Sequence, residues 1–380
     1  MPEILPQIER MFRGAIEAGV CGGVVYQVAA GGRTVVRQAL GCAQVDPVTR
    51  PMQIDTVFDL ASVTKTVTAG TLATMLLEEG RLALDQGVVE LVPELASPEQ
   101  RRITVRHLLT HTSGLPCVTT PGVAAMTAGG DTRRVLFETL FALPLRFAPG
   151  TGIEYTCLNF LVLTLAIERL TGEPLDQLCQ RRVFGPLGMS STRFNPPPPL
   201  AVRAAATSAC RWRDRMLVGE VQDSHALAMG GVSGNAGLFS TAADLTRYGQ
   251  MIAGRGALGG VRLLAPETVA LMTTNHTRQL AGQVAPLTGG RGLSWDTSFP
   301  GWWGGDRLST RSVGKTGWTG TSIAIDLERQ LTVVILTNRH QTDPTGNRIS
   351  ALRPVWHDAI IAMAEAAGLV EGAHGTASRG

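Results

Sequence analysis

The spacing of apolar and polar residues separates the two ends of the chain from its middle. At the start, apolar residues recur every third or fourth position, which predicts a helix over residues 3–19. Two valine-rich segments follow, at 22–29 and 33–40, and the Gly31-Gly32 pair between them is typical of a β-hairpin. Towards the other end, the pattern predicts three strands and a final helix, over residues 308–316, 319–326, 330–337 and 349–367.

The middle of the chain has a mostly helical pattern. One helix is expected after Asp59 and ends near Gly80, a typical helix stop. Two segments interrupt the pattern: consecutive prolines within residues 195–200 predict an extended linker, and glycines within residues 230–240 predict a loop. Further helices are predicted over residues 104–110, 131–142, 157–171, 174–184, 242–254 and 265–273.

Strands at both ends and helices between them predict an α+β fold. The simplest assembly joins all the strands into one antiparallel β-sheet, flanked by the N- and C-terminal helices. The expected units are a discontinuous sheet domain (1–75 and 286–370), a mostly helical inserted domain (76–285) and a disordered tail (371–380). The 380 residues allow this division, since a domain holds roughly 150 residues. A ligand site is expected where the two domains meet.

Charge and composition exclude several classes of protein. The net charge is +3, aromatic residues make up 5%, and no long basic run occurs, so nucleic-acid binding is not expected. The N-terminal segment lacks the basic stretch and apolar core of a secretory signal, which predicts a cytoplasmic protein. The sequence contains no uninterrupted apolar stretch of about 18 residues, so a membrane span is not expected. The oligomeric state is not indicated.

Cysteines and histidines do not predict a metal site. The six cysteines are widely spaced and contain no C-x-x-C pair, so neither a zinc site nor a disulfide framework is expected. His107 and His111 have the spacing of a helical metal pair, but their segment offers no third ligand. We expect these histidines to serve helix capping and core packing instead.

Lysine is nearly absent from this chain. Of the 34 basic residues, only Lys65 and Lys315 are lysines. A desolvated lysine can lose its proton, whereas an arginine cannot do so at workable pH. The two lysines are therefore candidates for acid–base chemistry.

Ser62 and Lys65 form an S-x-x-K motif at an expected helix start, so their side chains share one face of the first turn. A serine hydroxyl becomes a good nucleophile when a neighbouring base removes its proton. Burial and nearby positive charge lower the pKa of a lysine and enable it to be that base. The helix N-terminus also favours a developing oxyanion. The alternative is that Ser62 is an ordinary N-cap.

Two further segments carry candidate chemistry. Lys315-Thr316-Gly317 lies in a predicted strand, where the glycine would let a substrate approach the backbone. The alternative is a tight hairpin with an exposed lysine. Tyr155 is one of three tyrosines and follows a Pro-Gly loop at a predicted helix start. Next to two lysines, its phenol could exchange protons as a phenolate.

In this order, S-x-x-K, Tyr and K-T-G resemble the motifs of the penicillin-recognising serine hydrolase superfamily. Its members include class C β-lactamases, DD-peptidases, D-aminopeptidases and family VIII esterases. The resemblance implies a β-lactamase/transpeptidase-like fold and an acyl-enzyme mechanism, and no cofactor is expected. Other blocks similar to the family span residues 55–340: FDLASVTKTVTA, ITVRHLLTHTSGLP, FAPGTGIEYT, VFGPLGMSST, GGVSGNAGLFSTAADL and GKTGWTGTSIAID.

The resemblance implies a role for each motif residue. Ser62 would attack the substrate carbonyl and form the acyl-enzyme, and Lys65 would hold or accept its proton. Tyr155 would act as general base and later as acid toward the leaving group. Lys315 would keep Tyr155 ionised and bind an anionic substrate group.

The resemblance also implies an oxyanion hole and a substrate-binding edge. The backbone N–H groups of Ser62 and Trp318 would form the oxyanion hole, and Thr316 and Gly317 would lie along the substrate. The indole of Trp318 would suit an apolar or aromatic acyl group, or it packs between the domains.

One position departs from the family pattern. The second motif is usually Tyr-x-Asn, but here it is Tyr155-Thr156-Cys157, and a thiol cannot replace an amide that contacts an acylamino side chain. Asn159 shares the helical face but not the family position. This departure favours an ester over a peptide or a β-lactam.

The sequence therefore predicts a serine hydrolase, and a carboxylesterase of the family VIII type more than its relatives. The substrate would be a small-molecule ester, amide or β-lactam. The alternatives are a β-lactamase, a D-amino-acid peptidase or DD-carboxypeptidase, an acyltransferase, and an inactive relative that binds a ligand as a sensor.

Overall fold

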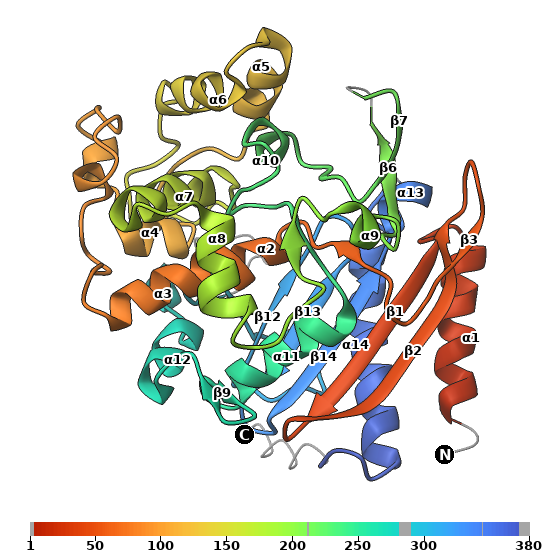
Figure 1. The fold of residues 1–380 in the computed structure, drawn as a ribbon. Helices are drawn as coiled ribbons and strands as arrows, with labels where there is room; N and C mark the ends of the chain where they lie inside the picture. Colours follow the sequence, from red (N-terminus) through yellow and green to blue (C-terminus); the bar gives the residue numbers. More distant parts are fainter. Residues whose placement is uncertain (1–3, 211–212, 281–289, 344, 372–380) are drawn as a thin grey trace.

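The computed structural model describes residues 4–210, 213–280, 290–343 and 345–371, so the tail expected over 371–380 lies outside the described residues except for Glu371. A seven-stranded antiparallel sheet runs in the order β11-β12-β13-β14-β1-β2-β3. Strands from the two ends of the chain are neighbours, as predicted, because Val24 pairs with Thr337 (Figure 1). The strands are β1 (Gly23–Ala30), β2 (Arg33–Gln44), β3 (Arg50–Pro51), β11 (Asp296–Thr297), β12 (Ser312–Thr316), β13 (Ser322–Asp326) and β14 (Leu331–Thr337).

Helices α1 (Ile4–Glu17) and α14 (Ile349–Ala366) pack together on one face of the sheet. The ring of Phe12 on α1 lies with its centroid 5.3 Å from that of Tyr26 and 4.9 Å from that of Trp356. Alternate residues of β1 and β14 point into this core, as the two-residue repeat of a strand requires. The expected covering of the sheet by the terminal helices is confirmed.

Helix α11 (Ala242–Ala253) covers the opposite face of the sheet and contacts β1, β13 and β14. Gly249 permits this close approach, because a Cβ at that position would lie 2.4 Å from Thr332 Cγ2. Gln250 Nε2 donates hydrogen bonds to the Ala29 carbonyl and the Thr332 hydroxyl. The helix belongs to residues 76–285 and yet packs on the sheet. The division into two domains stays a prediction.

The helix expected between Asp59 and Gly80 contains a wider turn. It consists of α2 (Val63–Lys65), a π-helical segment (Thr66–Gly70) and α3 (Thr71–Glu78). Thr71 Oγ1 donates to the carbonyl of Thr66 at 2.8 Å, and a Cβ on Gly70 would lie 2.2 Å from Ser294 Oγ. Tight packing against Ser294 thus accompanies the irregular turn, a feature common near functional sites.

The other predicted helices are present, with ends shifted by one or two residues or continued as a π-helical turn, which is ordinary for helix termini. They are α4 (Val105–Leu109), α6 (Thr132–Phe141), α7 (Leu158–Thr171), α8 (Leu175–Cys179, continued by a π-helical turn Gln180–Phe184) and α12 (Pro266–Thr273). The sequence did not predict α5 (Thr120–Ala128), α10 (Ser224–Ala228) or α13 (Arg339–Thr342). Short strands complete the fold: β4 (Phe58–Asp59), β5 (Arg193–Phe194), β6 (Ala206–Cys210), β7 (Arg215–Val218), β8 (Leu238–Ser240), β9 (Ala257–Leu258) and β10 (Val261–Arg262).

Two expectations for loops need correction. The prolines within residues 195–200 do not form only an extended linker, because Pro198 opens the helical turn α9 (Pro198–Ala201). Proline suits that position, since the N–H it lacks has no partner in the first turn of a helix. The glycine-rich segment 230–240 is not entirely a loop, because β8 occupies its end and pairs with β4 and β5. In the described part of the chain, no helix is both long and apolar enough to cross a membrane.

Candidate active site

Ser62 stands at a sharp turn between strand β4 and helix α2. Ala61 before it adopts a φ of +46°, a conformation that costs a non-glycine residue energy and that clusters at functional sites. The turn is held by Ala61 N–H, which donates to Asp59 Oδ1 at 2.9 Å, and by Leu60 N–H, which donates to the Leu238 carbonyl. The Ser62 side chain makes no capping hydrogen bond. Ser62 thus occupies the N-cap position of α2, but its hydroxyl does not cap the helix and is available for chemistry.

Lys65 is fully buried behind Ser62. Its Nζ donates to Ser62 Oγ at 3.0 Å, to the Asn235 carbonyl at 2.8 Å and to Cys157 Sγ at 3.4 Å. These three acceptors match the three protons of an ammonium group. Burial by itself lowers the pKa of Lys65, but Cys157, Tyr155 and Asp223 outweigh it, and the pKa is raised. The sequence allowed Lys65 to be a base on the condition that burial and positive charge lower its pKa. In the structure the opposing groups, which come from distant segments, outweigh burial.

Tyr155 reaches the same point from the loop before α7. The helix begins at Leu158, three residues after Tyr155, so Tyr155 does not stand at the helix start as predicted. Burial raises the pKa of the Tyr155 phenol, while the charge of Lys65 acts in the opposite direction. Cations surround the ring: Lys315 Nζ, Lys65 Nζ and Arg291 Cζ lie 4.8, 5.2 and 5.7 Å from its centroid. A phenolate at this position would have strong electrostatic support.

His111 fixes the backbone on both sides of Tyr155. Its carbonyl accepts from Glu154 N–H at 3.0 Å, its Nδ1 accepts from Thr156 N–H at 3.2 Å, and its ring lies 4.5 Å from the Tyr155 ring. Burial, with Lys315, Arg291 and Lys65 nearby, holds the pKa of His111 well below its usual range, so the imidazole is neutral. The sequence placed His111 in the core but did not connect it with Tyr155.

The companion histidine has the capping role that the sequence predicted. The Thr104 hydroxyl accepts from the backbone N–H of His107, and the backbone N–H of Thr104 donates to His107 Nδ1 at 3.2 Å. This reciprocal pair is a capping box at the start of α4. His107 therefore supports the helix that leads to His111.

Lys315 lies on β12 and is 1% exposed. Its Nζ is 3.3 Å from Asp296 Oδ1 on the neighbouring strand β11, and Arg291 forms an ion pair with the same carboxylate. Burial lowers the pKa of Lys315 to about 8, with Asp296 opposing and Arg291 adding to the shift. The exposed-hairpin alternative is wrong. The ammonium already has a carboxylate partner, which differs from the expected role in binding an anionic substrate group.

The end of β12 is joined to the turn that carries Ser62. Thr319 Oγ1 donates to the Asp59 carbonyl at 2.7 Å, and Thr321 Oγ1 donates to the Leu60 carbonyl at 2.9 Å. Gly317 packs against the second of these hydrogen bonds, where a Cβ would be 2.4 Å from the Leu60 oxygen. Gly317 is thus required for this close approach of two backbone segments. Thr316 closes the strand and is partly buried beside it.

A pocket of about 600 Å³ opens in front of these groups. Within the described residues, the backbone N–H groups of Ser62 and Trp318 donate no hydrogen bond, and both residues line the pocket. Two free N–H groups beside a nucleophile suit the oxyanion of an acyl-transfer reaction. The lining consists of Asp59, Ala61, Ser62, Thr119, Val123, Tyr155, Cys157, Ser208, Ala209, Cys210, Leu217, Gln222, Asp223, Ser224, Ala236 and Trp318.

Comparisons with known proteins agree on one family. The family model described as Beta-lactamase matches residues 8–353. An Escherichia coli K12 protein, named provisionally as a D-alanyl-D-alanine carboxypeptidase, is 30% identical over 77% of this chain and 72% of its own. An N-acetylmuramyl-L-alanine amidase of Bacillus subtilis 168 is 30% identical over 90% of this chain and 83% of its own. The structure of EstCE1, a hydrolase with promiscuous acyltransferase activity, matches with a TM-score of 0.73 at 22% identity, over 94% of this chain and 98% of that one.

These matches fit the observed fold, in which strands from both ends of the chain form one sheet between helices. They also fit the order of the S-x-x-K, Tyr and K-T-G motifs. The match to the family model extends over nearly the whole chain and includes every motif residue. The chain therefore belongs to the β-lactamase family of serine hydrolases.

Proposed function

We propose that the protein is a carboxylesterase that acts on neutral esters through an acyl-enzyme at Ser62. The observation that carries this proposal is the charge of the pocket wall. Within the described residues, no basic side chain lines the pocket, whereas Asp59 and Asp223 do. Lys315 is buried and balanced by Asp296. A substrate that bears a carboxylate, such as a β-lactam or a peptide with a free C-terminus, would lack a cationic partner there.

In the proposed reaction, Tyr155 first accepts a proton and then returns it, both when the acyl-enzyme forms and when it is hydrolysed. Ser62 Oγ attacks the carbonyl carbon while its proton passes to the Tyr155 oxygen. The oxyanion accepts hydrogen bonds from the backbone N–H groups of Ser62 and Trp318. When the carbon–oxygen bond to the alcohol breaks, Tyr155 returns the proton to the alcohol. Water then repeats the sequence on the acyl-enzyme and releases the acid and free Ser62.

Lys65 acts in this scheme as a fixed ammonium and not as the base. Its Nζ already donates to Ser62 and to the Asn235 carbonyl and lies 5.2 Å from the centroid of the Tyr155 ring, so it would orient the hydroxyl and favour the phenolate form of Tyr155. Lys315 adds a second positive charge near the Tyr155 ring.

Trp318 favours an apolar group on the substrate. Its side chain is 49% exposed and lines the pocket with Val123 and Leu217. The buried Arg339 holds it in place: its guanidinium carbon lies 4.3 Å from the indole centroid, and its Nε donates to the Trp318 carbonyl at 2.6 Å. A rigid indole offers apolar contact at little cost in side-chain entropy.

Two matched esters test the proposal directly. We expect 4-nitrophenyl butyrate to be hydrolysed with a kcat/KM on the order of 100-fold or more above that of 4-nitrophenyl hemisuccinate, because a carboxylate in this pocket would stay unpaired. Both rates are measured from released 4-nitrophenol. Nitrocefin and a peptide ending in D-alanyl-D-alanine are assayed beside them. Efficient turnover of either, or equal rates for the two esters, would contradict the esterase assignment.

The pH dependence of ester hydrolysis should report on Lys315. Since its pKa is lowered to about 8, Lys315 loses its charge as the pH rises through that value, and the support for a Tyr155 phenolate weakens. We expect kcat/KM to fall above about pH 8. Lys315→Arg keeps the charge and should move this fall to higher pH, whereas Lys315→Met should abolish the fall and hold kcat/KM near the low value that the native protein reaches at high pH. An unchanged profile in Lys315→Arg would assign the titration to another group.

A further inference from the structure

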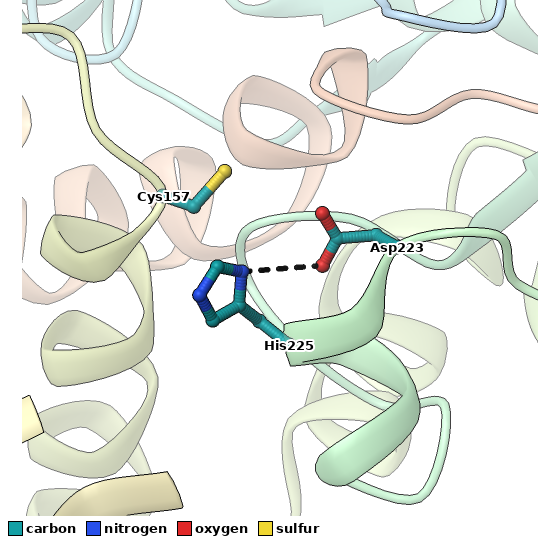
Figure 2. A group of neighbouring side chains, drawn as sticks. All are labelled: Cys157, Asp223 and His225. Carbon is teal, nitrogen blue, oxygen red and sulfur yellow. Dashed lines mark ion pairs between the residues drawn. The ribbon is translucent and has the colours of Figure 1, made fainter. Parts of the chain in front are cut away.

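Three side chains of different chemistry face one another beside the pocket. Cys157 stands directly before α7, Asp223 caps the N-terminus of α10, and His225 lies in the first turn of α10 (Figure 2). One potential ligand atom from each lies within 4.8 Å of the other two. Cys157 and Asp223 line the pocket, and His225 is buried behind them.

The donor atoms of this cluster are not used up by one another. His225 Nδ1 is 3.8 Å from Asp223 Oδ1, which is too far for a hydrogen bond. Asp223 Oδ1 accepts from Ala226 N–H and from Asn235 Nδ2, both at 2.9 Å, so the carboxylate is fixed in place. Its second oxygen, Oδ2, accepts no hydrogen bond within the described residues and faces the side of Cys157 in Figure 2. An oriented carboxylate with a free oxygen is suited to bind a cation.

The combination of thiol, carboxylate and imidazole selects the kind of cation. Zn²⁺ binds sulfur, nitrogen and oxygen at about 2.0–2.3 Å in a tetrahedron, whereas Mg²⁺ and Ca²⁺ prefer oxygen ligands alone. Ligand atoms around such an ion lie about 3–4 Å apart, so small side-chain rotations would bring these three into range. The fourth position would open toward the pocket, since Cys157 and Asp223 both line it.

We propose that Cys157, Asp223 and His225 form an inhibitory binding site for Zn²⁺ in the substrate pocket. Cys157 Sγ is the acceptor of a 3.4 Å hydrogen bond from Lys65 Nζ, so a bound ion would draw on the same sulfur lone pairs and stand close to the ammonium. Its charge would oppose the protonated Lys65, and its volume would obstruct the approach of a substrate to Ser62. The thiolate that Zn²⁺ requires is compatible with the neighbouring ammonium.

The test measures binding and inhibition separately. We expect Zn²⁺ to inhibit ester hydrolysis while Mg²⁺ does not, and Co²⁺ to give a thiolate-to-metal charge-transfer absorption band. His225→Gln removes one ligand from a residue that does not line the pocket and should weaken the inhibition at least roughly 10-fold. His276→Gln is the matched control and should be inhibited like the native protein. Cys157→Ser should abolish the absorption band.

Two results would overturn this site. One is equal inhibition of His225→Gln and the native protein, and the other is native protein without a cobalt–thiolate band. The band does not depend on any substrate, so a failure of the esterase proposal would leave this test intact.

Discussion

Replacing Ser62 with alanine is expected to lower kcat/KM for 4-nitrophenyl butyrate by a factor on the order of 10⁴ or more, because loss of a nucleophile removes the covalent route entirely. The side chain has no structural hydrogen bond as a cap, so the fold should be unaffected. Hydrolysis and the circular dichroism spectrum are measured together. A fluorophosphonate should add its mass to the native protein and leave Ser62→Ala unmodified.

The control for Ser62→Ala is Ser190→Ala, which removes an exposed hydroxyl and should keep native activity and labelling. If Ser62→Ala still formed an adduct or retained substantial hydrolysis, the acyl-enzyme would be on another residue. If the native protein failed to react with the fluorophosphonate, the enzymatic assignment of Ser62 would be untenable.

Removal of a single oxygen in Tyr155→Phe is expected to slow acylation by a factor on the order of 10²–10⁴, the usual contribution of a general base. The aromatic ring and its contact with His111 remain, so the loss reports on proton transfer and not on packing. The measurement is the pre-steady-state burst of 4-nitrophenol, which isolates acylation from release of the acid.

Lys65 offers the decisive comparison for this prediction. If Tyr155 is the base, Lys65→Met should lower the rate by a smaller factor in the Tyr155→Phe background than in the native protein, because the part of its effect that acts through the phenolate is already lost and only its hydrogen bond to Ser62 Oγ remains. If Tyr155→Phe instead acylated at a rate within a few-fold of the native rate, Lys65 and not Tyr155 would be the base.

Much of the fold follows from local patterns in the sequence. The valine-rich segments of β1 and β2 and the strands near the C-terminus predicted one sheet formed from both ends of the chain, and β1 pairs with both β14 and β2. The helical turn at Pro198 was missed because a run of prolines suggests extension more strongly than it suggests a helix start. The wide turn at Thr66–Gly70 packs tightly against Ser294, a contact between distant segments that no local pattern contains.

The residues of the site could be predicted from the sequence, but the pKa shifts and the ion-pair partners of its lysines could not. Ser62, Lys65, Tyr155 and Trp318 meet at one pocket or directly behind it, as the motifs indicated. The direction of the Lys65 pKa was not predictable, because it depends on acidic groups from other segments. In the same way, Asp296, the ion-pair partner of Lys315, lies on a two-residue strand that is too short to produce a periodic pattern. The contact between His111 and Tyr155 joins segments that are far apart in the sequence.

The threonine hydrogen bonds that join the end of β12 to the Ser62 turn have a consequence for biosynthesis. Thr319 and Thr321 are translated long after Asp59 and Leu60, the residues whose carbonyls they hold. A growing chain on the ribosome therefore carries Ser62, Lys65 and Tyr155 well before it can complete an oxyanion hole. Under the mechanism proposed above, a message cut short before β12 would yield a product that has its nucleophile but lacks the Trp318 N–H group of the oxyanion hole.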